Sequence, residues 1–265
     1  MDNSVIFSLM LSFLAGISTG IGGILGFFIK KEDLKALSLG LGFSAGVMIY
    51  VSFMEMTRQS EISLGNALGN NLGHWISIIS FFGGIALAGV VDWFLPETVN
   101  QDELSIEQDN PKLFADKLHR MGIFTALAIT VHNFPEGLAT FMAGMSNLTL
   151  GASVAVAIAI HNIPEGIAVS LPIYNATGSR KKAFLYSSLS GLAEPLGAIL
   201  GYTLLRQVLN DLTFGILFAL VAGIMVYISF DELLPAAREY GKGHLAILGV
   251  SIGMLVMAVS LKLMQ

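Results

Sequence analysis

The 265-residue chain is apolar for its length: 54% of its residues are hydrophobic, only 12% are charged, and the mean hydropathy is +0.72. Soluble globular proteins carry about 25% charged residues, so this composition indicates a protein that exposes apolar surface to lipid. The absence of cysteine excludes disulfides and thiolate metal sites. A net charge of -5 without a basic tract argues against nucleic-acid binding.

Eight apolar segments are long enough to cross a bilayer, because a helix needs roughly 20 residues to span about 30 Å of hydrocarbon. In chain order they are 4–29, 34–56, 74–95, 122–144, 150–171, 183–205, 212–231 and 245–263. The first has no basic region before it and runs on apolar beyond a signal peptide, which indicates a retained span. The sequence therefore predicts an all-α polytopic membrane protein with eight transmembrane helices in a single domain, residues 1–265.

Basic residues cluster in alternate connections between these spans. Eleven of the 14 follow the first, third, fifth and seventh spans: Lys30, Lys31, Lys35, Lys112, Lys117, Arg120, Arg180, Lys181, Lys182, Arg238 and Lys242. Because cytoplasmic loops are enriched in Lys and Arg, this asymmetry predicts that both termini face away from the cytoplasm. Residues 97–120 then form an acidic cytoplasmic loop, which its composition indicates to be a solvated, flexible linker.

Two internal repeats organise the chain. HNFPEG, starting at His132, returns as HNIPEG at His161, and AGVMIYVSFMEM (45–56) is similar to AGIMVYISFDEL (222–233). In the predicted topology the second and seventh spans run in opposite directions, which is typical of an inverted repeat. The simplest arrangement matches spans 1–3 with spans 6–8 and places spans 4 and 5 at the centre, a 3+2+3 inverted repeat.

The repeated motif concentrates polar groups on one helix face. His132 and Glu136 are separated by one helical turn and share a face, with Asn133 beside Glu136. The second copy repeats this face with His161, Asn162 and Glu165. The proline of each copy deprives a carbonyl of its usual partner, and the glycine allows a neighbouring helix to approach closely.

The depth of these groups points to metal binding. His132, His161 and Glu194 lie roughly 10–11 residues into their spans, which at 1.5 Å per residue is about 15–16 Å, the middle of the bilayer. A carboxylate there costs at least about 2.5–3.5 kcal/mol, and Glu136, Glu165 and Glu194 would also repel one another. A divalent cation offsets both penalties. Imidazole and carboxylate ligands without sulfur suit Zn²⁺, Fe²⁺ or Mn²⁺, and the ligands suffice for two adjacent ions.

HNFPEG, HNIPEG and the later GLAEPLGA together resemble the ZIP (Zrt/Irt-like protein) family of divalent-metal transporters, most closely its bacterial ZupT-type branch, over essentially all eight spans. The resemblance implies a binuclear site between helices 4, 5 and 6, metal movement into the cytosol across the bacterial inner (plasma) membrane, and an elevator-like displacement of the transport helices. Zn²⁺ is the expected substrate, with Fe²⁺, Mn²⁺, Cd²⁺ and Co²⁺ left open. The metal ligands it implies are His132, Asn133, Glu136, His161, Asn162, Glu165 and Glu194.

Several residues outside the motif are also candidates for contact with the ion. Glu55 near the outer end of the second span, and Asp231 and Glu232 near the inner end of the seventh, are hypothetical cation attractors. Met48 could offer a sulfur ligand, but packing is the favoured interpretation. Many family members have a His-rich loop between helices 3 and 4, whereas this loop holds only His119. A homodimer is left open, because residue types do not determine the oligomeric state.

Two other classes of function remain as alternatives. An intramembrane zinc hydrolase would use His and Glu around a catalytic ion, but the chain has no HExxH, and an inverted duplication is unnecessary for hydrolysis. A proton-coupled carrier of organic solutes would use the same cluster as a proton relay. The crowding of three carboxylates with two imidazoles favours metal over the relay, and no enzyme activity is expected.

Overall fold

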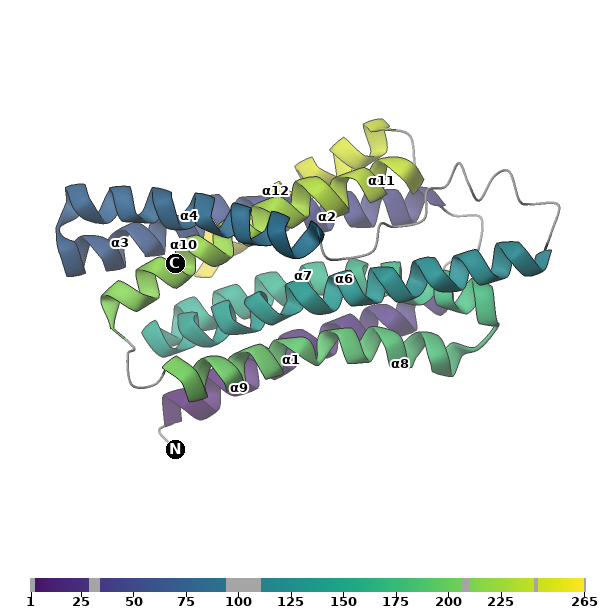
Figure 1. Cartoon of the computed structure of the whole chain (residues 1–265), viewed down its shortest axis with the longest axis horizontal. Helices are drawn as coiled ribbons and strands as arrows, with labels where there is room; N and C mark the ends of the chain where they lie inside the picture. The colour runs from purple at the N-terminus through teal and green to yellow at the C-terminus, as the bar shows by residue number, and fades with distance from the viewer. Residues whose placement is uncertain (1–2, 29–33, 94–110, 206–209, 241–242, 265) are drawn as a thin grey trace.

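The computed structural model describes residues 3–28, 34–93, 111–205, 210–240 and 243–264, and all regular structure in these ranges is helical. The described helices make up eight long passes, whose arrangement Figure 1 shows. In chain order these are α1 (Asn3–Leu25) with a 3₁₀ turn (Gly26–Phe28); α2 (Leu34–Val51), η2 (Ser52–Met56) and α3 (Thr57–Leu68); α4 (Asn70–Trp93); α6 (Pro111–Ser146); α7 (Leu148–Thr177); α8 (Arg180–Gly191) and α9 (Ala193–Leu205); α10 (Asp211–Ile228), η3 (Ser229–Leu233) and α11 (Leu234–Tyr240); and α12 (Gly243–Met264).

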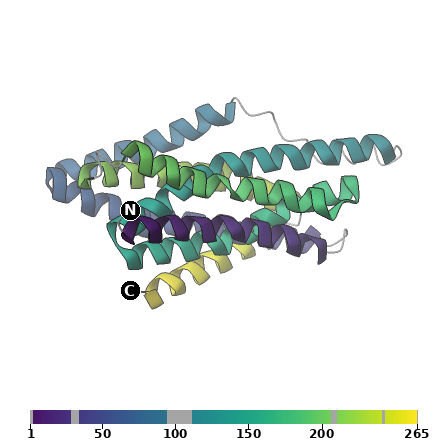
Figure 2. The same cartoon turned by 90° about the horizontal axis from the view of Figure 1, so that it is seen from below.

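The predicted polytopic helical fold is confirmed. Seven of the passes among the described residues are long and apolar enough to cross a membrane. The remaining pass, α6, has 36 residues but carries the polar HNFPEG motif and a charged first third, which make it less apolar. The two ends of the chain lie at the same end of the molecule (Figures 1 and 2), as an even number of crossings requires.

Several predicted boundaries were wrong. Residues 111–120, assigned to the loop 97–120, belong to α6, whose first residue is Pro111, a residue well suited to the first helical turn. Residues 97–110 of that loop lie outside the described part of the chain. The second pass was expected to end at residue 56 but continues to Leu68, because α3 packs on α4 and α10. It stops at Gly69, whose φ of 83° is a conformation that glycine adopts readily.

The passes form two bundles, which lie as the lower and upper layers of Figure 1. The motif bundle contains α1, α6, α7, α8 and α9, and therefore both HNxPEG copies. The partner bundle contains α2, α3, α4, α10, α11 and α12. The bundles touch mainly where α2 meets α7 and where α10 meets α6. Both HNxPEG copies and Glu194 thus lie in one bundle.

Packing in the partner bundle follows the inverted repeat residue by residue. A Cβ added to any of four glycines would lie 2.0–2.2 Å from a carbonyl oxygen of the facing helix, so only glycine permits these contacts. The α10–α4 contacts repeat the α2–α12 contacts. Residues of α10 lie 177 positions after their counterparts in α2, and residues of α12 lie 169 positions after their counterparts in α4. They are Gly46 with Val250 and its counterpart Gly223 with Phe81, and Gly253 with Phe43 and its counterpart Gly84 with Leu220.

The repeat also has a matching backbone irregularity. SFMEM of η2 and SFDEL of η3 are both π-helical, at positions 177 residues apart. In each, the serine hydroxyl donates to the carbonyl oxygen four residues earlier at 2.7 Å, from Ser52 to Met48 and from Ser229 to Met225. The two segments are therefore similar in structure as well as in their apolar composition.

Candidate metal centre

The two motif copies meet because of where the chain turns. Asn147 separates α6 from α7, and its side chain caps α7 by accepting from the backbone N–H groups of Thr149 and Leu150. The turn lies midway between His132 and His161, so antiparallel packing brings the two copies to the same level. Both imidazoles are buried in the motif bundle.

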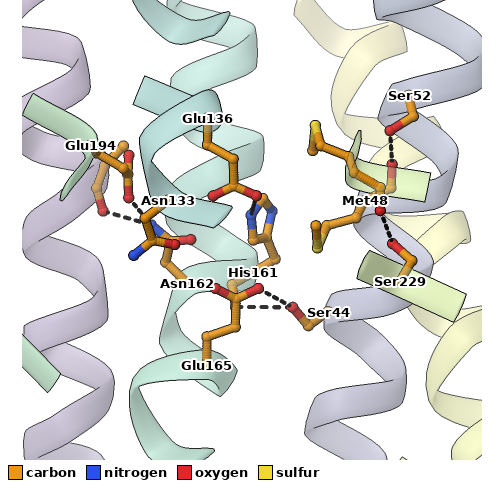
Figure 3. A network of polar contacts seen from close by, with 12 residues as sticks. Ser44, Met48, Ser52, Asn133, Glu136, His161, Asn162, Glu165, Glu194 and Ser229 are labelled. Atoms are coloured by element: carbon orange, nitrogen blue, oxygen red, sulfur yellow. Dashed lines mark hydrogen bonds and ion pairs between the residues drawn. The ribbon is translucent and has the colours of Figure 1, made fainter. Parts of the chain in front are cut away.

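Three side chains form a compact group. Glu136, His161 and Glu165 each offer a ligand atom, and these atoms all lie within 4.8 Å of one another. Nε2 of His161 lies 3.2 Å from Oε1 of Glu136, which joins α7 to α6 (Figure 3). All three residues are completely buried. One imidazole between two carboxylates in a dry site matches the ligand types that Zn²⁺ prefers.

His132 lies at the edge of this group. It is buried within electrostatic range of Glu136 and His161, and its Nε2 has no hydrogen-bond partner among the described residues. It also lines a cavity of about 470 Å³ between the two bundles. Asp92, Tyr227 and Glu232 line the same cavity, whose walls are otherwise mostly apolar.

The two asparagines face away from the compact group. Nδ2 of Asn133 donates to the carbonyl of Ser190 at 3.0 Å, and Nδ2 of Asn162 donates to that of Ala15 at 3.1 Å. Asn162 also donates to Oε1 of Glu194 (Figure 3). Each asparagine keeps an unpartnered, buried Oδ1 atom among the described residues. These oxygens and the second oxygen of Glu194 form an oxygen-rich side of the centre.

Two residues were missed in the sequence: Ser44, which contacts the centre, and Asp92, which lines the cavity. The hydroxyl of Ser44 on α2 donates to Oε1 of Glu165 at 3.1 Å and to the carbonyl of His161 at 3.3 Å, which links the partner bundle to the motif bundle (Figure 3). The hydroxyl of Tyr227 donates to Oδ2 of Asp92 at 3.3 Å. A serine in an apolar helix and an aspartate near a helix end are common, so neither gave a signal.

The residues proposed outside the motif differ in their surroundings. Glu55 is buried, and its carboxylate accepts from Arg58 at 3.1 and 3.3 Å and from Gln59 at 3.0 Å. Its charge is therefore compensated locally, which weakens the idea that it attracts cations. Glu232 lines the cavity near Asp92 instead. Met48 is buried on α2 and lies across from His161 (Figure 3).

Comparisons with known proteins agree with this geometry. Residues 97–261 match the ZIP Zinc transporter family. The chain is 55% identical to "Zinc transporter ZupT" of Clostridium perfringens, over 98% of this chain and 97% of that protein. The proteins of the same name from Streptococcus mutans and Chlorobaculum parvum are 54% and 58% identical, each over 99% of both chains. The chain is thus a multi-pass membrane protein that belongs to the ZIP zinc transporter family, a family of transporters and not of enzymes.

Proposed function

We propose that this protein carries Zn²⁺ across the membrane, with Glu136, His161 and Glu165 at the centre of the transport site. The observation that carries the proposal is that their ligand atoms lie within 4.8 Å of one another while completely buried in the motif bundle. Three such groups without a counter-ion would be costly at membrane depth. The names of the relatives support zinc as the substrate, and the same ligand types would also accept Fe²⁺, Mn²⁺, Cd²⁺ or Co²⁺.

The unpartnered atoms support room for two ions. Among the described residues, Nε2 of His132 and the second oxygens of Glu136 and Glu165 lack hydrogen-bond partners on one side. On the other side, the Oδ1 atoms of both asparagines and the second oxygen of Glu194 lack them as well. One ion would have mixed nitrogen and oxygen ligands, and the other would have oxygen ligands. Glu136 and Glu165 would bridge the two.

The resemblance to the ZIP family supplies the direction of transport, and the charge asymmetry of the loops supplies the orientation of the protein in the membrane. The positive-inside rule orients the termini away from the cytoplasm, and the plasma membrane is the location we propose. In this orientation Asp92 and Glu232, which line the cavity with His132, lie toward the cytoplasmic ends of their passes. These carboxylates, together with Asp231, would draw the released ion inward. Zinc uptake is therefore the direction proposed.

Division into two bundles supports alternating access by sliding of the motif bundle against the partner bundle. Contacts within each bundle are held by glycines whose added Cβ would clash with backbone, whereas Gly40 of α2 meets Pro164 of α7 across the boundary at an ordinary 3.7 Å. Close backbone packing resists relative movement more than ordinary side-chain contact does. The sliding surface is thus expected between α2 and α7 and between α10 and α6.

Reconstituted protein tests the proposal directly. Zinc flux into liposomes, read by a trapped fluorescent chelator, is expected for the purified chain and absent for the double variant His161→Ala, Glu165→Ala. A proton relay for organic solutes or an intramembrane hydrolase would produce no zinc flux from the wild type, and transport through another site would leave the flux of the double variant intact. Either result would reject transport through this site.

A further inference from the structure

The internal symmetry of the motif bundle gives each residue around the centre a counterpart. Residues of α7 lie 29 positions after their counterparts in α6, and residues of α8 and α9 lie 175 positions after theirs in α1. One pair of contacts fixes both offsets. A Cβ on Gly137 would lie 1.9 Å from the carbonyl oxygen of Glu194, and a Cβ on Gly166 would lie 1.9 Å from that of Thr19. Thr19 is therefore the counterpart of Glu194.

Hydrogen bonds support the same register independently. Asn133 donates to the carbonyl of Ser190, and its counterpart Asn162 donates to that of Ala15. The carbonyl of Ser190 lies one helical turn, four residues, before Glu194. The carbonyl of Ala15 likewise lies four residues before Thr19. Glu194 reaches the asparagine of α7. Its counterpart is thus placed beside the asparagine of α6.

The side chain of Thr19 matches this expectation. It is completely buried, and its Oγ1 has no hydrogen-bond partner among the described residues. Oγ1 lies 3.1 Å from the position that a Cβ on Gly191 would take, next to the carbonyl that Asn133 binds. The carbonyl of Thr19 already accepts from Ser187 at 2.7 Å. The hydroxyl remains free, and a buried hydroxyl without a partner costs free energy unless a ligand satisfies it.

We propose that Thr19 is an affinity-determining residue of the metal centre. Its hydroxyl contacts the ion on the side of Asn133, as the carboxylate of Glu194 does on the side of Asn162. The inference rests on the proposed function. With threonine in place of a fourth carboxylate, two divalent ions face three negative charges and the two halves of the duplicated site are unequal. A carrier must bind its ion weakly enough to let it leave. The neutral hydroxyl makes its half of the site bind an ion more weakly than the half that contains Glu194.

Zinc titration of the purified full chain by calorimetry tests this assignment. Thr19→Val, which keeps the shape and removes the hydroxyl, is expected to raise the Kd of the weaker zinc-binding step about fivefold. Thr19→Ser should stay within about twofold of the wild type, because it keeps the hydroxyl. Thr19→Asp should lower the Kd at least about tenfold and slow zinc flux, because it adds a charge next to the ion.

Ser8→Ala is the matched control, since Ser8 is buried on the same helix and its hydroxyl donates to the carbonyl of Ser4 at 2.8 Å. It should bind zinc as the wild type does. A Thr19→Val variant that binds zinc with unchanged affinity would overturn the inference. If that variant does not fold, a Thr19→Asp variant that binds zinc no more tightly than the wild type would overturn it. A wild type that binds no zinc would instead overturn the proposed function, and the inference with it.

Discussion

Glu136 connects the two copies of the motif. It shares a helix face with His132 on α6 and lies 3.2 Å from His161 on α7. One of its oxygens faces that imidazole, and the other has no partner among the described residues. A carboxylate in this position can bridge two ions, whereas a neutral amide would offer one oxygen and no charge.

Glu136→Gln is therefore expected to reduce zinc binding by roughly 100-fold or more, since even groups that only support a metal ligand contribute 10- to 100-fold. Zinc titration by calorimetry measures the effect. Glu61→Gln is the control, because Glu61 is exposed and pairs with His74 at 3.0 Å away from the centre. Equal affinities of the Glu136→Gln variant and the wild type would remove this carboxylate from the site.

Glu55 and Glu232 occupy equivalent positions of the inverted repeat but have different surroundings. Arg58 compensates Glu55, while Glu232 lines the cavity with Asp92. Glu55→Gln should change initial zinc uptake at low zinc by less than about twofold, because Arg58 and Gln59 already compensate the carboxylate of Glu55. Glu232→Gln should slow zinc uptake severalfold more than Glu55→Gln does. Flux measured in liposomes at low zinc compares them, and a larger effect at Glu55 would reverse the assignment of the attracting carboxylate.

The sequence predicted contacts within one helix better than contacts between helices. His132 with Glu136, and His161 with Glu165, follow from the helical period alone. Ser44, Asp92 and Thr19 could not be found this way, because their roles depend on which helix faces them and in what register. The asparagines share the motif with these residues, but their donors bind helix backbone, and residue type does not reveal which carbonyl accepts.

At the scale of helices, glycine contacts set how closely the passes approach. A Cβ on Gly84 would lie 2.0 Å from the carbonyl oxygen of Leu220, whereas a Cβ on the adjacent Gly83 would meet nothing within 4 Å. Gly84→Ala should therefore separate α4 from α10 and destabilise the protein by about 1–3 kcal/mol. Gly83→Ala, on the same helix, should leave stability equal or slightly higher.

Thermal unfolding in detergent compares these two variants. A lower Tm for Gly84→Ala alone is the expected result. Equal Tm values for the two variants would contradict the close α4–α10 contact, and with it the residue-by-residue match to the α2–α12 contact.

Helix positions were predictable from apolar length, but their ends and irregularities were not. Hydropathy placed all eight passes, yet it could not register that α3 continues as a polar-faced helix beyond the apolar segment. The π turns of η2 and η3 were invisible as such, although the similarity of their sequences marked them as equivalent. Hydropathy reports contact with lipid, whereas these features depend on packing between helices.

The division into two bundles is a property of the whole molecule. The sequence predicted the 3+2+3 repeat, but the repeat units are not the packing units, because α1 joins α6–α9 while α2–α4 join α10–α12. Contact between helices that are distant in the chain decides this grouping. The boundary between α2 and α7 is therefore where relative movement is tested.

A cysteine pair can lock that boundary in a chain that has no cysteine of its own. The Cβ positions at Gly40 and Pro164 lie 3.7 Å apart, within the range of a disulfide. The double variant Gly40→Cys, Pro164→Cys should lose most zinc flux when oxidised and regain it with reductant, and the reduced protein serves as its own control. Undiminished flux through the cross-linked protein would contradict sliding of the bundles.

The central claim is that zinc occupies the centre formed by Glu136, His161 and Glu165. Anomalous diffraction at the zinc absorption edge, from crystals of the full chain grown with zinc, tests it most directly. We predict a peak about 2.0–2.2 Å from ligand atoms of all three residues, with a second peak on the side of Glu194. Zinc peaks confined to the surface of the molecule, with none at this centre, would contradict the account.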